Sequence, residues 1–317
     1  MFKKVSIILV IVICLVIGFS GSTFADNYPT KPIEFIVPWS PGGGSDTLMR
    51  IVAKYLGEYL GVAVPVINKP GVSGTIGLIE AMDKPNDGYH ITQIHEGLPT
   101  AYHLGITEIN YDDFLPVASM TSSPQYLAVA QDFPANTIEE FVKYAKEHPN
   151  EVLMGCTMRG IMEIWSRVFE DKTGIQLKYV SYEGTGARVK GLAGGFVDSI
   201  IVDYPSGNQF VKAGKFRFLA SATKERLEWS PDIPTMIESG YDLEWSVRRG
   251  IVVPKGTPLD RVKILEEGLR KVAQDKNFIK DVETAGGAIE FVSFEDYGAY
   301  LKKLDADIAR AAEKITQ

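Results

Sequence analysis

Cysteine is nearly absent from this chain of 317 residues, which contains two, Cys14 and Cys156. Cys14 lies inside a long apolar run near the N-terminus without a lipobox around it, so a lipid anchor is not expected. If that run is removed, one cysteine remains and no internal disulfide can form. Cys156 has no catalytic motif around it, which favours a buried thiol over a nucleophile. Stability is therefore expected to come from burial of apolar surface.

Motifs of the common hydrolases and of nucleotide-binding enzymes are also missing. The segment Gly71–Thr75 fails the G-x-S-x-G pattern at its last position. The glycine-rich segment 42–47 fits neither G-x-G-x-x-G nor a phosphate-binding P-loop. The four histidines fit no metal-binding spacing such as H-E-x-x-H; they are His90, His95, His103 and His148. These absences argue against an enzyme, a metal site and a cofactor.

Positive charge is in deficit. Lysine and arginine number 33 against 40 aspartates and glutamates, for a net charge of −7. Loss of an N-terminal segment that contains Lys3 and Lys4 but no acid would make it −9. An acidic surface argues against nucleic acid or an anionic membrane as a partner.

The first 25 residues have the pattern of a secretory signal peptide. Two lysines precede an almost unbroken apolar run over 5–19, and Thr23 and Ala25 place small residues at −3 and −1 of a cleavage site. That run is short for a membrane-spanning helix. We expect cleavage after Ala25 and export of a periplasmic protein, in preference to an uncleaved membrane anchor.

Three consecutive glycines, Gly42 to Gly44, follow a segment that predicts a strand over 33–37. Because glycine has no Cβ, the backbone of this turn can bend freely and come close to a ligand. An apolar stripe over 48–59 predicts a helix that opens at or near Asp46, with Asp46 as its N-cap. The free N–H groups at the start of a helix favour an anion. The turn is a candidate anion site, although such junctions also serve as plain connections.

Strands and helices alternate along the chain, with glycine turns between them. The pattern predicts a helix over 75–82 and strands over 62–67, 90–94, 125–130, 152–156, 177–180 and 196–202. This alternation is typical of a parallel sheet covered by helices on both faces. Ligands bind such sheets beyond the carboxyl ends of the strands, which is where the glycine turns lie.

Four sets of motifs occur in order over nearly the whole chain after residue 25. They are Tyr28-Pro-Thr-Lys-Pro-Ile33 with Val37-Pro-Trp-Ser-Pro-Gly-Gly-Gly-Ser-Asp46; Asn68-Lys-Pro-Gly71 with Gly74-Thr-Ile-Gly77 and Asp87-Gly-Tyr89; Tyr182-Glu-Gly-Thr-Gly-Ala187 with Gly194-Gly-Phe-Val-Asp198; and Pro234-Thr-Met-Ile-Glu238 with Pro254-Lys-Gly-Thr-Pro258. In this order the chain resembles the exported receptors of tripartite tricarboxylate transporters, the Bug family of solute-binding proteins.

The resemblance implies an α/β, two-domain periplasmic-binding-protein fold of the type II kind, each domain a mainly parallel sheet flanked by helices. Domain 1 would comprise 26–124 and 250–317, and domain 2 would comprise 125–249. The cleft between them would close on a carboxylate, held partly through water by loops of both domains. By position, those loops correspond here to Trp39, Ser40, Gly42, Gly43, Ser45, Asp46, Gly74, Thr75, Gly184, Thr185, Gly186 and Ala187.

Two segments depart from the family's pattern. The turn 155–160 carries Met158 and Arg159 where the family usually has glycine or serine, and the segment 245–250 has two arginines where the family often has one or none. An arginine in a dry site binds a carboxylate strongly and bidentately. The candidates beside glycine turns are Arg159, Arg188 and Arg249, and we expect at least one to contact the ligand. The alternative for each is a solvated arginine or a structural ion pair.

Three further side chains are candidates for the cleft. Trp39 would line the cleft or lie in the core, and His95 would line the cleft or end a strand with a hydrogen bond. Asp203, at the end of a predicted strand, would select an amino or hydroxyl group on the ligand, or else cap the next turn.

The sequence thus predicts a monomeric receptor, not an enzyme, that delivers a small mono-, di- or tricarboxylate to the membrane permease subunits of a tripartite transporter. A receptor that feeds an extracytoplasmic sensor kinase stays open as an alternative, and an exported enzyme that acts on a small acid is a remote one.

Overall fold

The computed structural model describes residues 28–316, so the predicted signal peptide over 1–25 lies outside the described residues. The strands are β1 (Glu34–Val37), β2 (Val66–Asn68), β3 (His90–Ile94), β4 (Phe114–Ala130), β5 (Leu153–Cys156), β6 (Lys178–Ser181), β7 (Ser199–Asp203), β8 (Phe216–Ser221), β9 (Ser246–Pro254) and β10 (Ala288–Val292). The α-helices are α2 (Gly44–Leu60), α3 (Thr75–Met82), α4 (Gly97–His103), α5 (Ile138–Glu147), α6 (Ile161–Thr173), α7 (Gly184–Ala193), α8 (Tyr204–Lys212), α9 (Leu259–Gln274), α10 (Lys276–Thr284) and α11 (Phe294–Thr316). Within 28–316, no helix combines the length and the apolar character needed to cross a membrane.

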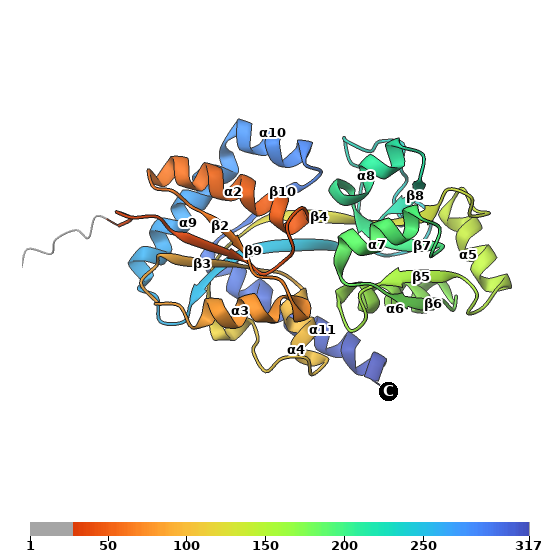
Figure 1. Ribbon diagram of the computed structural model, residues 1–317, viewed down its shortest axis with the longest axis horizontal. Coiled ribbons are helices and arrows are strands. Elements are labelled where there is room, and N and C mark those ends of the chain that lie inside the picture. Colours follow the sequence, from red (N-terminus) through yellow and green to blue (C-terminus); the bar gives the residue numbers. More distant parts are fainter. Residues whose placement is uncertain (1–27, 317) are drawn as a thin grey trace, which may run out of the picture. The chain divides into compact units, whose positions relative to one another are not determined.

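Two groups of parallel strands are joined by two antiparallel strands. In the first strand group β1 lies between β2 and β3 and is parallel to both. In the second strand group β5 lies between β6 and β7, again in parallel. Between the groups run β4 and β9, which pair antiparallel over residues 114–124 of β4 (Figure 1). The remaining residues of β4 pair with β7 and β8. This confirms the predicted α/β fold class and adds the antiparallel pairing of the crossing strands.

Strand bounds differ from the prediction where the sequence pattern is interrupted. The crossing strand β4 has 17 residues instead of the predicted six over 125–130, because the polar run Thr121–Ser123 hides its continuation. The predicted strand 62–67 shrinks to β2, since Pro65 has no N–H to donate to a ladder. β2 stands at the edge of the sheet.

Both glycine-rich turns enter their helices earlier than the sequence suggested. The helix α2 begins at Gly44, and Gly43 is its N-cap in extended conformation. The prediction that Asp46 is the N-cap was therefore wrong, because Asp46 lies inside the first helical turn. The segment Gly184–Ala187, expected as a turn, forms the first turn of α7.

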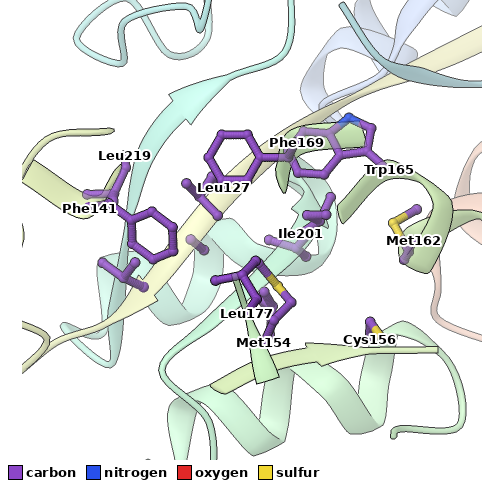
Figure 2. Packing of buried hydrophobic residues seen from close by; sticks show 14 of the residues in the cluster. Leu127, Phe141, Met154, Cys156, Met162, Trp165, Phe169, Leu177, Ile201 and Leu219 are labelled. Carbon is purple, nitrogen blue, oxygen red and sulfur yellow. The ribbon is translucent and has the colours of Figure 1, made fainter. Parts of the chain in front are cut away.

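Buried apolar side chains form separate clusters on the two strand groups. One cluster packs α5 and α6 against the second strand group and includes Leu127, Trp165 and Ile201 (Figure 2). Cys156 belongs to it, which confirms the expected buried thiol, and burial raises the pKa of this thiol to about 12. Helix α11 packs against both strand groups: Tyr297 belongs to the apolar cluster of the first group and Ile308 to that of the second.

We predict that Gly250→Ala destabilises the protein. Gly250 lies in β9, where an added Cβ would stand 1.9 Å from the hydroxyl oxygen of the buried Tyr297 on α11. Such overpacking costs about 1–3 kcal/mol. Thermal unfolding should show a lower Tm than wild type. Gly298→Ala is the control, because its Cβ would meet no atom closer than 3.7 Å and alanine favours a helix. An unchanged Tm for Gly250→Ala would contradict this packing of α11.

Candidate functional site

Asp46, in the first turn of α2, stabilises the glycine turn 42–44 through hydrogen bonds. Its Oδ2 accepts a hydrogen bond from the backbone N–H of Gly42 at 2.9 Å. Its Oδ1 accepts from Arg50 Nε at 2.9 Å and from Asn68 Nδ2 at 2.8 Å. Gly42 has φ +79°, a left-handed conformation that favours glycine. The carboxylate of Asp46 thus holds the shape of the turn, with its oxygens bonded to the protein's own donors.

The other two glycines of the turn face different surroundings. Gly43 has φ −84°, and a Cβ there would meet only Ser40 O at 3.6 Å, so the fold does not require glycine at this position. A Cβ on Gly44 would lie 3.0 Å from Arg249 Nη2 and 3.3 Å from Asp203 Oδ2. The absence of a side chain at Gly44 therefore allows the turn to approach both charged groups.

Arg249, on β9, is buried at 3% exposure and bonded to neutral oxygens. Its Nε donates to Ser45 Oγ at 3.0 Å, and its Nη1 donates to Ser123 Oγ at 2.7 Å and to Val247 O at 3.0 Å. Burial lowers the pKa of its guanidinium, and an arginine stays charged even so. Nη2 has no acceptor in the described part of the chain and faces Gly44.

Arg188, on α7, is a second buried cation, at 2% exposure. Its Nε donates to Ile201 O at 3.2 Å, and its two terminal nitrogens donate to Thr157 Oγ1 at 3.2 Å and Thr185 Oγ1 at 3.4 Å. Burial lowers the pKa of its guanidinium to about 10, which leaves it protonated at neutral pH.

Asp203 lies close to both arginines without an ion pair to either among residues 28–316. It is the N-cap of α8, and its Oδ1 accepts from the Ser206 N–H at 3.0 Å. The charge of Asp203 opposes the fall in pKa of both Arg188 and Arg249. Its Oδ2 has no hydrogen-bond donor in the described chain. Two guanidinium groups and one carboxylate therefore converge from β9, α7 and the end of β7.

Trp39 and His95 form an uncharged aromatic wall in the same region. Their rings stack with centroids 4.3 Å apart and an interplanar angle of 15°. Burial, with Arg249 nearby, lowers the pKa of His95 to about 3, and its Nδ1 accepts from the Gly97 N–H at 2.8 Å. A Cβ on Gly74 would press on the Trp39 ring at 3.0 Å. Within 28–316, Trp39 Nε1 and Thr75 Oγ1 are buried without a hydrogen-bond partner.

Sequence reasoning missed Glu96, Ser123 and Thr157. Glu96, at 2% exposure, accepts the Arg248 backbone N–H with both carboxylate oxygens at 3.0 and 3.2 Å. Burial raises the pKa of Glu96 to about 7. No local pattern marks Glu96 or Thr157. For Ser123 a signal existed, because three consecutive hydroxyl residues, 121–123, are unusual in a buried strand.

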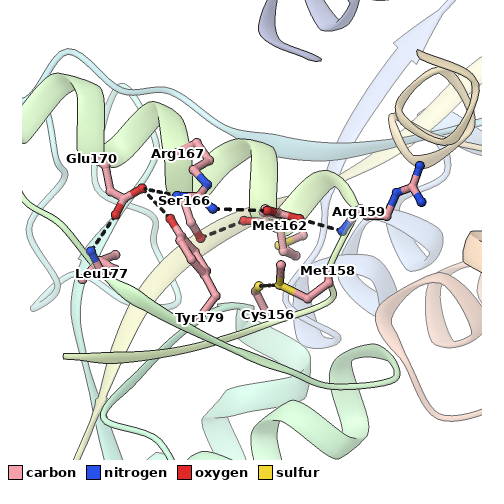
Figure 3. A network of polar contacts seen from close by, with 10 residues as sticks. Cys156, Met158, Arg159, Met162, Ser166, Arg167, Glu170, Leu177 and Tyr179 are labelled. Carbon is pink, nitrogen blue, oxygen red and sulfur yellow. Dashed lines mark hydrogen bonds and ion pairs between the residues drawn. The ribbon is translucent and has the colours of Figure 1, made fainter. Parts of the chain in front are cut away.

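Some predicted site residues are exposed and do not join the buried charges. Arg159 is exposed, its backbone N–H donates to Glu163 at 2.6 Å, and its guanidinium donates to the Leu104 carbonyl at the end of α4. Figure 3 shows that this guanidinium points away from the polar network of α6. Arg159 shares no hydrogen-bond partner with Arg188 or Arg249. Ser40, Gly184, Gly186 and Ala187 are exposed, so they stand at the surface of their turns.

Comparison with known proteins gives one consistent family. A family model described as the tripartite tricarboxylate transporter family receptor matches residues 48–310. Protein BugT of Bordetella pertussis is 28% identical over 285 residues, which cover 88% of this chain and 87% of BugT.

Solved structures agree with the sequence comparison. The periplasmic binding protein BugD is 28% identical, with a TM-score of 0.81 and coverage of 90% of this chain and 98% of that one. An R. palustris protein whose structure was solved with adipate is 25% identical, with a TM-score of 0.81 and the same coverage of the two chains, 90% and 98%.

We predict that Glu96→Gln changes the pH dependence of stability. Burial disfavours the ionised form of Glu96, whereas the backbone N–H of Arg248 and the charges of Arg248 and Arg249 on β9 favour it. A carboxyl whose pKa rises from 4.5 to about 7 on folding makes the folded state less stable as pH rises through that window. Glutamine cannot ionise, so this loss is absent in the variant.

The measurement is Tm of both proteins at pH 5 and pH 8. The Tm of the variant relative to wild type should increase with pH, by an amount that corresponds to at most about 1.4 kcal/mol per pH unit. His95 contributes equally to both proteins and cancels in the difference. A constant difference across this range would show that Glu96 ionises normally in the folded protein.

Proposed function

Because the chain belongs to the tripartite tricarboxylate transporter receptor family, we propose that it captures a small organic carboxylate and delivers it to the membrane permease subunits of such a transporter. The family is one of solute-binding receptors, and periplasmic binding proteins are among its solved structures. The relative solved with adipate supports a carboxylate as the ligand.

The observation that carries the proposal is the pair of buried arginines. Arg188 and Arg249 are held by neutral oxygens, and the charge of Asp203 acts on both, so these three groups have a net positive charge. Glu96 also acts on Arg249, and burial raises the pKa of this carboxyl to about 7. Buried charges are usually paired, and an anionic ligand would supply the missing partner. The first-turn N–H groups of α2 and α7 add the positive ends of two helix dipoles. Gly43 and Gly186 leave those turns open to close approach, because a Cβ on either would meet nothing nearer than 3.6 Å.

The remaining parts of the proposal concern domains and export. We assign 26–124 with 250–317 to one domain and 125–249 to the other, with β4 and β9 as the segments that bend when the two close on the ligand. The Arg159–Leu104 hydrogen bond, which joins the turn after β5 to the end of α4, supports such a closed arrangement. We further propose that the chain is cleaved after Ala25 and acts in the periplasm as a monomer without catalytic activity.

Thermal unfolding in the presence of candidate ligands tests the function. A ligand that binds only the folded protein, at 100 times its Kd, adds about 2.7 kcal/mol of stability. We expect small mono-, di- or tricarboxylates or their substituted forms to raise Tm, and sugars and simple cationic amines to leave it unchanged. If only sugars or metal ions raise Tm in a broad screen, the carboxylate function is wrong.

The variant Gly43→Val tests the place of the site. The backbone at Gly43 is compatible with valine, so the variant should fold with a Tm close to that of wild type. A branched side chain there would keep the ligand from the amides of the turn, and loss of one charge-assisted hydrogen bond reduces affinity by about tenfold or more. Titration calorimetry with an acid found in the screen measures the loss, and Gly298→Ala is the control that should bind normally. If the Gly43→Val protein folds and binds the acid as tightly as wild type, the turn only connects β1 to α2 and does not bind the ligand.

A further inference from the structure

The arrangement of the three buried charges is specific enough to narrow the ligand. We propose that the solute is an acidic α-amino acid, with one carboxylate on Arg249, the other on Arg188, and the ammonium group on Asp203 Oδ2. This inference rests on the proposed function, because it names the class of carboxylate that the receptor takes.

The two arginines have donors left for a ligand after their protein contacts are counted. Arg249 uses Nε and Nη1 in its bonds to Ser45, Ser123 and Val247, so both hydrogens of Nη2 stay free among residues 28–316. Each terminal nitrogen of Arg188 carries two hydrogens and gives one to a threonine hydroxyl. Each guanidinium can therefore donate at least two hydrogen bonds to a carboxylate.

Asp203 is placed to accept, because within residues 28–316 it forms no salt bridge to either arginine. Its Oδ1 is fixed by the N–H of Ser206, which orients the carboxylate from the start of α8. Its Oδ2 comes within 3.3 Å of the Cβ position of Gly44, the same position that Arg249 Nη2 approaches at 3.0 Å. A carboxylate that stands beside two guanidinium groups without forming a salt bridge is available to a donor on the ligand.

The charges select between ligands of similar size. Two arginines and one aspartate have a net charge of +1, which an acidic amino acid, with two carboxylates and one ammonium, neutralises. An unsubstituted dicarboxylate has no group for Asp203 and brings a like charge toward it. A hydroxy dicarboxylate can donate one hydrogen bond to Asp203 Oδ2, but its net charge of −2 exceeds the +1 of the three groups. Glu96 is a further carboxyl near Arg249, and at pH 6 it is mainly protonated because its pKa is about 7.

Titration calorimetry at pH 6 with aspartate, malate and succinate tests the inference. The three share a four-carbon backbone and differ only in the amino, hydroxyl or hydrogen substituent at C2. Glutamate, 2-hydroxyglutarate and glutarate form the same set with one more carbon. We expect the amino member of at least one set to bind about tenfold or more tightly than its unsubstituted member, with the hydroxy member between.

The matched variant is Asp203→Asn. Asparagine is as good an N-cap as aspartate, so α8 should be retained, and the loss of a charge that favours both buried guanidinium groups should lower Tm without unfolding the protein. The variant should lose about tenfold or more in affinity for the amino acid, and its affinity for the unsubstituted diacid should stay the same or increase. Together these changes would invert or abolish the preference of the wild-type protein.

The outcomes separate the inference from the function on which it rests. Wild-type binding of malate, succinate or glutarate as tight as that of the amino acids would overturn the inference and leave the carboxylate receptor intact. So would an amino-acid preference that survives in Asp203→Asn. If no acid of any kind binds the wild-type protein, the proposed function itself fails.

Discussion

The burial of Arg249 is the constraint on which the rest of the site depends. A guanidinium that loses its water needs hydrogen-bond partners, and this one takes them from three elements: the first turn of α2, the strand β4 and its own strand β9. All three acceptors are neutral oxygens. These hydrogen bonds stabilise the charge of Arg249 but do not neutralise it. In a buried ion pair, by contrast, a carboxylate neutralises the cation. A Cβ at Gly44 would come within 3.0 Å of this guanidinium, so the glycine turn and the arginine constrain each other.

The site is built from the first turns of helices that follow parallel strands. Ser45 stands in the first turn of α2 after β1, Thr185 in that of α7 after β6, and Asp203 caps α8 after β7. The carboxyl ends of parallel strands meet at one edge of a sheet, so each such helix directs its unpaired N–H groups, and a polar side chain of its cap or first turn, to a common region. The crossing strands add Ser123 and Arg249, which no helix start could supply. The geometry follows from the α/β architecture, and the chemistry from a few residues at these junctions.

The sequence predicted the elements with regular patterns and the family, and it missed what depends on contacts between distant segments. The strand 90–94 and the helix 75–82 have the predicted bounds. Arg188, Arg249, Asp203 and His95 were named in advance because each follows or adjoins a glycine turn or a strand end, and the structure brings them together. Glu96 and Thr157 could not be named, since their roles exist only once β9 and α7 lie beside them. The cap of α2 was misplaced because Asp46 has the composition of an N-cap, yet its carboxylate reaches back to Gly42 from inside the helix.

The two segments that depart from the family's pattern have different surroundings. Arg249 is buried, lies among neutral oxygens and faces Asp203, so its charge acts on whatever enters the site. Arg159 is exposed and sits at φ +55°, in a conformation that few side chains adopt, and its guanidinium bonds to a carbonyl across the fold. An exposed arginine bonded to a carbonyl contributes little to the field at a buried site, because water screens it. Arg159 therefore joins the turn after β5 to the end of α4, whereas Arg188, Arg249 and Asp203 are the buried charges on which the proposed choice of anion depends.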